Sequence, residues 1–191
     1  SKFAFFLMAL VGLPIIFNME PLLVIWLGKE QVSTHMVLFA QWTLIQAMAQ
    51  AFDYPITQTV RATGDIKYYQ IITGVLMLTF LPICYIAFKL NMPAISSMVI
   101  LTILTFGVLH YRVVKLSQIL DISCFKYYVR IVLPAILTLL PSVLLSALLP
   151  LRNDTFIYLC LSLISIFLIT AICVYFIGMG KSEKQFALSF I

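Results

Sequence analysis

The stretch His35–Tyr69, HMVLFAQWTLIQAMAQAFDYPITQTVRATGDIKYY, decides how the rest of the chain is interpreted. Residues 36–60 are long and apolar enough to cross a bilayer, because a membrane-spanning helix needs about 20 residues. At about 100° per residue, four polar side chains share one narrow arc of this helix: Gln46, Gln50, Asp53 and Thr57. The opposite arc is apolar and comprises Leu44, Met48, Phe52 and Pro55. We therefore expect the apolar face to meet lipid and the polar face to meet protein or a wet cavity.

The composition indicates an all-α integral membrane protein. Hydrophobic residues make up 63% of the 191 residues and charged residues only 10%, whereas soluble domains carry about 25% charged residues. The chain begins at Ser1 and runs almost at once into an apolar segment, without the basic region and cleavage site of a signal peptide. We therefore expect it to be one transmembrane domain of a larger transporter.

Six apolar segments are predicted to span the membrane. The first is interrupted by Pro14 and Pro21 and is expected to break between Asn18 and Pro21. Residues Lys89–Pro93 are expected to form a tight turn. The fourth is expected to end where charge returns at His110–Lys115, which leaves no Lys or Arg inside any span. The six predicted spans are residues 3–28, 36–60, 68–88, 90–111, 131–151 and 155–180.

The basic residues are distributed unevenly about these spans. Six spans place nine of the twelve Lys and Arg residues on one side and Lys29, Lys89 and Arg152 on the other. Cytoplasmic loops carry the excess of Lys and Arg, so both ends of the chain are predicted to be cytoplasmic. This topology accounts for the net charge of +5, and no nucleic-acid partner is inferred.

The sequence offers little to catalysis. His35 and His110 fall at opposite membrane faces, and no phosphate-binding glycine loop is present. The four cysteines lack metal-binding spacing and are interpreted as small, mostly apolar packing residues: Cys84, Cys124, Cys160 and Cys173. We predict no enzyme activity, no metal site and no cofactor.

The polar arc is therefore the candidate site. A carboxylate such as Asp53, removed from water, binds a proton or pairs with a cation, which favours a coupling or gating role. For Gln46, Gln50 and Thr57, a hydrophilic path and interhelical hydrogen bonding both remain open. Asn18 and Glu20, at the predicted break, are placed in the outer interface rather than in a cavity.

Four basic residues near the cytoplasmic side have two interpretations. They attract a lipid phosphate, or they only orient the protein in the membrane. They are Arg61, Lys67, Arg112 and Lys115.

Three segments together resemble a known family. They are Glu20–Gly28 (EPLLVIWLG), Thr59–Gln70 (TVRATGDIKYYQ), and the paired-helix segment Ile71–Leu116 followed by Phe125–Arg130 (FKYYVR). In order and spacing they resemble the C-terminal part of a polysaccharide flippase of the O-antigen exporter type, in the multidrug/oligosaccharidyl-lipid/polysaccharide exporter superfamily. The resemblance covers roughly residues 3–150.

The resemblance implies a two-lobe transporter that alternates between inward- and outward-open states in the bacterial inner membrane. Its cargo is expected to be an undecaprenyl-pyrophosphate-linked oligosaccharide, moved to the periplasmic leaflet for lipopolysaccharide and other surface polysaccharides. The N-terminal lobe is missing from this chain, and the polysaccharide polymerase machinery is a further expected partner. Because the predicted spans lack a basic residue, the pyrophosphate is expected to meet either a charge in the missing half or Arg61 and Lys67 at the cytoplasmic mouth.

Two alternatives are kept. One is a cation-coupled drug exporter of the same superfamily, whose site would favour aromatic and acidic side chains. The other is a structural membrane subunit, or a membrane-embedded enzyme, of a glycan-assembly complex. The predicted loops are too short to hold a catalytic domain, which disfavours the enzyme.

Overall fold

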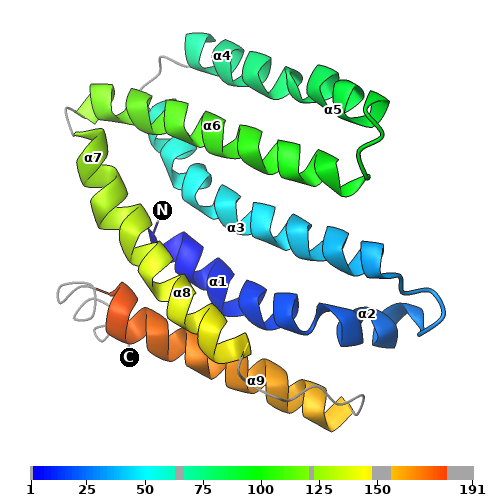
Figure 1. The fold of residues 1–191 in the computed structure, drawn as a ribbon. Coiled ribbons are helices and arrows are strands. Elements are labelled where there is room, and N and C mark those ends of the chain that lie inside the picture. Colours follow the sequence, from blue (N-terminus) through cyan, green and yellow to red (C-terminus); the bar gives the residue numbers. More distant parts are fainter. Residues whose placement is uncertain (1, 63–66, 121–122, 148–155, 180–191) are drawn as a thin grey trace. The chain divides into compact units, whose positions relative to one another are not determined.

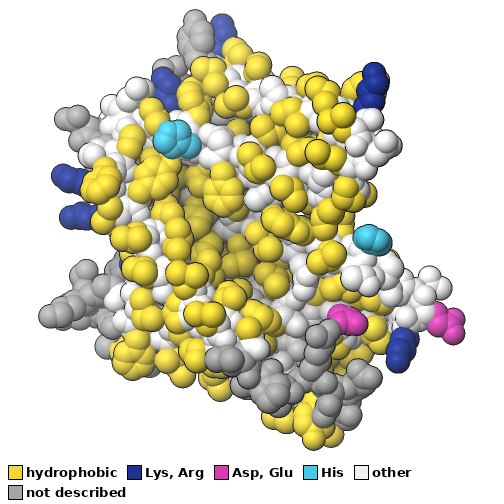
Figure 2. Space-filling view, viewed as in Figure 1, with side chains coloured by type: hydrophobic (Ala, Val, Ile, Leu, Met, Phe, Trp, Pro, Cys, Tyr) yellow, Lys and Arg dark blue, Asp and Glu magenta, His cyan; other side chains and the backbone are white. Residues whose placement is uncertain are grey.

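The computed structural model describes residues 2–62, 67–120, 123–147 and 156–179, and these residues are almost entirely helical, without strands (Figure 1). The chain divides into two compact units, one formed by Ser33–Tyr127 and the other by Lys2–Val32 with Tyr128–Ile191. Figure 2 shows a surface covered mainly by hydrophobic side chains, with Lys and Arg side chains at its edges. Such a surface suits contact with lipid.

The first unit is built around a long helix, α6 (Ile95–Leu120), which contacts every other helix of the unit. It packs most extensively against α3 (Thr34–Ala62), and α4 (Lys67–Leu78) and α5 (Phe80–Lys89) run beside it. The short helix α7 (Cys124–Tyr127) follows it. The predicted turn before α6 is present, with Asn91 at φ 58° and the Met92 N–H donating to the Ala87 carbonyl. Asparagine tolerates this left-handed conformation better than most residues do.

The second unit contains α1 (Lys2–Phe17), α2 (Met19–Leu27), α8 (Leu133–Ala147) and α9 (Phe156–Cys173). Two π-helical turns accompany them: η1 (Tyr128–Val132) precedes α8, and η2 (Val174–Gly178) ends α9. Pro134 lacks an N–H, so the regular bonding pattern is interrupted just after η1. Helices α1, α8 and α9 contact one another and form the core of this unit.

The predicted break in the first span is confirmed, and it is sharp. Helices α1 and α2 meet at Asn18 with a bend of 71°. Pro21 provides no N–H to continue the α1 bonding pattern, while the buried Asn18 side chain donates through Nδ2 to the Pro14 carbonyl at 2.9 Å. The break is shorter than predicted, because α2 already begins at Met19, and Glu20 is exposed.

Four helical segments among the described residues are long and apolar enough to cross a membrane: Tyr69–Lys89, Ile95–Ile119, Cys124–Ala147 and Phe156–Gly178. The bent pair α1 and α2 makes a fifth if it counts as one span. The predicted segment 36–60 does form a helix, α3, but α3 is not among these spans, because its polar residues lower its hydropathy. A multi-pass membrane protein is therefore supported, and six spans are not confirmed.

The boundaries of two predicted spans differ from the structure in an informative way. The fourth span, predicted as 90–111, is a helix that begins at Ile95 and continues to Leu120. The fifth, predicted as 131–151, belongs to a helical segment that already begins at Cys124. The ends of the predicted spans at 151 and 155 lie outside the described residues.

Candidate functional site

The candidate site is a buried ion pair between α3 and α6. The Arg112 guanidinium donates through Nη1 to Oδ2 of Asp53, and both side chains are largely shielded, with exposed fractions of 16% and 17%. Arg112 lies within the helical segment Ile95–Ile119, which is long and apolar enough to cross a membrane, so the predicted end of the fourth span at Tyr111 does not coincide with the end of a helix. Nothing in the sequence ends the helix at Tyr111, and the charge was mistaken for the start of a loop.

Thr57 is the second residue that holds the guanidinium. It lies one helical turn after Asp53 on α3, so both side chains point to the same side of the helix. The Thr57 hydroxyl oxygen accepts a hydrogen bond from Arg112 Nη1 at 2.8 Å and another from the Tyr69 hydroxyl at 3.4 Å. These two donors occupy its acceptor positions. In this conformation the Thr57 hydroxyl oxygen helps to hold the Arg112 guanidinium in place.

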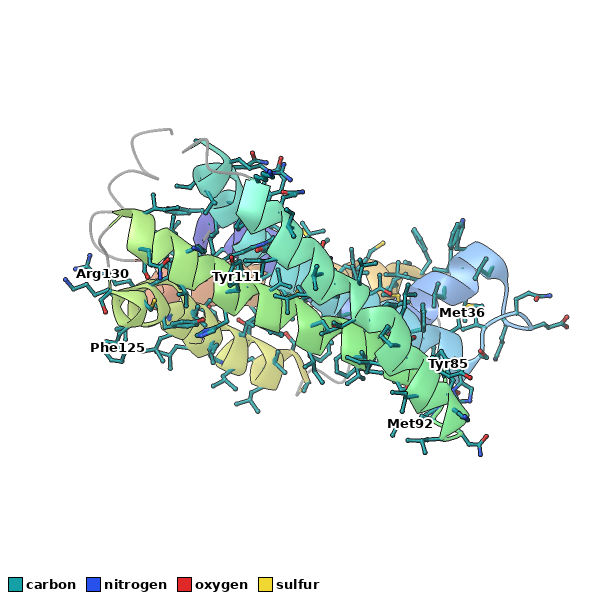
Figure 3. All side chains as sticks on the ribbon, turned by 90° about the horizontal axis from the view of Figure 1, so that it is seen from above. Met36, Tyr85, Met92, Tyr111, Phe125 and Arg130 are labelled. Carbon is teal, nitrogen blue, oxygen red and sulfur yellow. The ribbon has the colours of Figure 1, made fainter. Side chains whose placement is uncertain are left out.

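Two tyrosines complete the cluster. Tyr69, from the first turn of α4, is buried, and the Arg112 guanidinium lies 5.7 Å from its ring centroid, within the range of a cation–π interaction. Tyr111, labelled on α6 in Figure 3, stacks on Tyr69 with ring centroids 6.4 Å apart and an interplanar angle of 19°. The contacts of Tyr69 connect α4 to the ion pair.

The ion pair is incompletely satisfied. Asp53 Oδ1, Arg112 Nε and the Tyr111 hydroxyl are buried and have no hydrogen-bond partner among the described residues. A bidentate Arg–carboxylate pair would use two nitrogens and both oxygens, whereas this pair is joined through Nη1 and Oδ2 alone. Among the described residues, the cluster therefore holds one unused donor on Arg112, Nε, and one unused acceptor on Asp53, Oδ1.

The other predicted site residues are only partly brought together. Gln46 is buried on α3, whereas Gln50 is exposed, so the predicted polar arc is not shielded along its whole length. Arg61 and Lys67 are both exposed, at the end of α3 and the start of α4. Residues 63–66, which connect them, lie outside the described residues.

The prediction that the arc containing Met48 and Phe52 on α3 meets lipid also needs correction. Met48 and Phe52 are buried, with exposed fractions of 6% and 7%, whereas Tyr54 is 68% exposed. Periodicity identifies which residues share a face of a helix, but it does not identify which faces are packed. The exposed side of α3 lies between the two arcs defined by the sequence.

The sequence interpretation missed Arg112 as the partner of Asp53. The sequence did contain a signal, because a carboxylate inside a predicted span generally pairs with a cationic side chain, which can be looked for in the other spans. Arg112 is an Arg next to a predicted span with no helix-stop signal between them.

No family model, no curated protein and no solved structure matches the chain. The candidate site therefore rests on the geometry of the described residues.

Proposed function

We propose that this protein acts in membrane transport, as a flippase that moves an undecaprenyl-pyrophosphate-linked oligosaccharide from the cytoplasmic to the periplasmic leaflet of a bacterial inner membrane. The observation that carries the proposal is the shielded Asp53–Arg112 pair, whose arginine lies in a helix apolar enough to span a bilayer. Ionisable residues inside membrane segments are expensive to bury and generally mark transport pathways or ion relays.

The cost of the pair favours a functional role over a purely structural one. Removing two charges from water costs several kcal/mol per ion, and well-packed apolar side chains of similar volume hold helices together at least as well. The incomplete bonding of Asp53 and Arg112 strengthens this argument, because it leaves buried polar atoms without partners.

The chemistry of Arg112 suits a pyrophosphate-linked cargo. A guanidinium has a planar set of donors that matches phosphate oxygens, and Arg112 Nε has no partner among the described residues. Arg112 therefore replaces Arg61 and Lys67 as the principal candidate for contact with the pyrophosphate. The two exposed residues remain suited to attracting the cargo at the cytoplasmic mouth.

The resemblance to O-antigen exporters implies that the cargo also carries a sugar headgroup. A sugar headgroup cannot cross hydrocarbon without polar partners, because each unpaired hydroxyl costs energy in an apolar medium. The amides of Gln46 and Gln50 provide such partners on α3. A second lobe of helices and the polysaccharide polymerase machinery are the proposed partners, and both ends of the chain are proposed to be cytoplasmic.

A second function, export of a cationic drug, has one observation in its favour. Asp53 pairs with Arg112, and Arg112 in turn lies over the ring of Tyr69, which stacks with Tyr111. Acidic and aromatic side chains are the groups that recognise organic cations. Arg112 opposes this function, because it already neutralises the carboxylate that a cationic drug would need.

Complementation separates these two functions. The full-length protein is expressed in a strain that lacks its own copy, and surface glycan, drug susceptibility and protein level are measured together. We expect Arg112→Gln and Asp53→Asn each to reduce surface glycan per amount of protein in the membrane, because each is also expected to lower the protein level by destabilising the fold. The exposed Arg130 provides the matched control Arg130→Gln, which is expected to leave the glycan unchanged. Normal glycan display in both site variants would contradict the flippase, and a change in drug susceptibility alone would favour the exporter.

A further inference from the structure

The contact between Asp53 and Arg112 uses only part of what each side chain offers. It joins Nη1 to Oδ2, while Asp53 Oδ1 and Arg112 Nε are buried and have no partner in the part of the chain that the structure describes. An arginine that pairs optimally with a carboxylate presents two parallel N–H donors to two oxygens. The observed pair thus leaves one guanidinium donor and one carboxylate oxygen unused among the described residues, and a phosphate could engage that donor as well.

Arg112 does not depend on Asp53 alone for its position. Thr57 accepts a hydrogen bond from Nη1 at 2.8 Å, and the Tyr69 ring lies 5.7 Å from the guanidinium. Tyr69 is itself tied to Thr57 by a hydroxyl bond of 3.4 Å. Because these partners are uncharged, they can retain the guanidinium while its anionic partner changes.

Resting on the proposed function, we propose that Asp53 is an exchangeable counter-ion that occupies Arg112 until a phosphate anion of the cargo displaces it. A carboxylate and a phosphate cannot share one guanidinium at low cost, because like charges brought together inside a protein repel by several kcal/mol. The cargo and Asp53 therefore compete for Arg112. The contact between α3 and α6 acts as an autoinhibitory latch in the absence of cargo.

The exchange connects binding to movement. Asp53 belongs to α3 and Arg112 to α6, and these two helices form the most extensive packing of the first unit. When the phosphate takes the guanidinium, the charged contact between the helices is lost at this level, and their separation changes. A ligand shifts a conformational equilibrium only through such differential contacts.

Binding measurements on the full-length protein in nanodiscs test the competition, with inorganic pyrophosphate as the probe. We expect Asp53→Asn to bind pyrophosphate at least ~10-fold more tightly than wild type, because the competing carboxylate is absent. Arg112→Gln is expected to lose this binding. The exposed Glu30 supplies the matched control, since Glu30→Gln removes one negative charge elsewhere and is expected to bind as wild type does.

Two arms distinguish the source of the phosphate. One uses inorganic pyrophosphate in solution, and the other uses polyprenyl pyrophosphate incorporated in the nanodisc. Tighter binding by Asp53→Asn in both arms supports the exchange for either source. Tighter binding in the lipid arm alone supports it for a lipid headgroup. Equal or weaker binding than wild type in both arms would overturn the proposal.

A distance measurement keeps the test independent of whether Asp53→Asn folds. Tyr54 on α3 and Phe106 on α6 are exposed by 68% and 51%, so each tolerates a spin label after replacement by cysteine in a background without the four native cysteines. With Asp53 and Arg112 intact, polyprenyl pyrophosphate is expected to change the distance between the labels. An unchanged distance with cargo bound would overturn the latch.

Failure of the exchange is distinguishable from failure of the proposed function. If glycan export depends on Arg112 while Asp53→Asn binds no more tightly than wild type, the exchange is wrong and the flippase stands. If surface glycan is normal in both variants, the proposed function fails, whatever the binding measurements show.

Discussion

Arg112 Nη1 donates to the Thr57 hydroxyl oxygen at 2.8 Å, across 55 residues of sequence. The same oxygen accepts a hydrogen bond from the Tyr69 hydroxyl at 3.4 Å, so one threonine connects α3 to both α6 and α4. A hydroxyl oxygen with two donors has no free lone pair for a further donor. Thr57 therefore helps to set the geometry of the charged pair.

Replacing this threonine by valine tests its role. Thr57→Val keeps the branched shape but removes the acceptor, and we expect it to destabilise the protein by about 1.5–3 kcal/mol, the usual value for a hydrogen bond to a charged group. The measurement is the unfolding midpoint in nanodiscs. Thr59→Val is the matched control, because Thr59 is exposed and its hydroxyl bonds only to the Pro55 carbonyl of its own helix. Equal effects of the two substitutions would contradict the positioning role.

A double-mutant cycle tests the energetic coupling of the ion pair. Removing one partner leaves a buried charge uncompensated, so Asp53→Asn and Arg112→Gln are each expected to cost about 3–5 kcal/mol in the free energy of unfolding. The double variant is expected to cost less than either single variant, because no charge remains unpaired. Denaturant unfolding of all four proteins gives the coupling energy. Additive single effects would show that the two side chains do not interact in the membrane.

Cysteine labelling tests the proposed orientation. Met92 and Phe125 lie near opposite ends of α6, and both are exposed, by 49% and 75% (Figure 3). Helix α6 has 26 residues, which at about 1.5 Å per residue gives a length near ~39 Å, enough to cross a bilayer. In whole cells, Met92→Cys is expected to react with an impermeant maleimide and Phe125→Cys to react only after permeabilisation. The reverse result would invert the topology.

Part of this fold is predictable from the sequence because the signals are local. The proline-bounded break at Asn18 and the turn at Asn91 were both predicted, since each follows from what prolines and turn residues do to their own neighbours. The helical, membrane-spanning character follows from composition in the same way. These features do not depend on which helices pack together.

Of the charged pair in the candidate site, only Asp53 could be predicted from the sequence. Asp53 stood out because a carboxylate in an apolar segment is costly, but Arg112 sits 59 residues away and its role depends on how α3 packs against α6. The fourth span was predicted to end at the first charged residues, although a helix ends at stop signals rather than at a charge. Likewise Met48 shares an apolar arc in the sequence but is buried, because packing decides which faces are covered.

At Gly178 in the second unit, η2 lies close to side chains of α1 and α8. A Cβ built at Gly178 would lie 2.6 Å from Cζ of Phe6 and 3.0 Å from Cγ2 of Thr138. Phe6 and Thr138 are each only 2% exposed, so a Cβ at Gly178 would require a shift within buried packing. Real Cβ atoms essentially never approach to 2.6 Å, which makes glycine the residue that this packing requires.

We therefore expect Gly178→Ala to destabilise the protein by about 1–3 kcal/mol, the usual cost of overpacking a filled core. Gly74→Ala is the control, because Gly74 is helical with no atom within 4 Å of its added Cβ, and alanine is the better helix former by about 1 kcal/mol. The unfolding midpoint should fall for the first variant and stay level or rise for the second. Adding Phe6→Leu to Gly178→Ala should recover part of the loss, because the shorter side chain vacates the contested volume. If Gly178→Ala matched Gly74→Ala, the close contact among α1, α8 and η2 would be absent in the membrane.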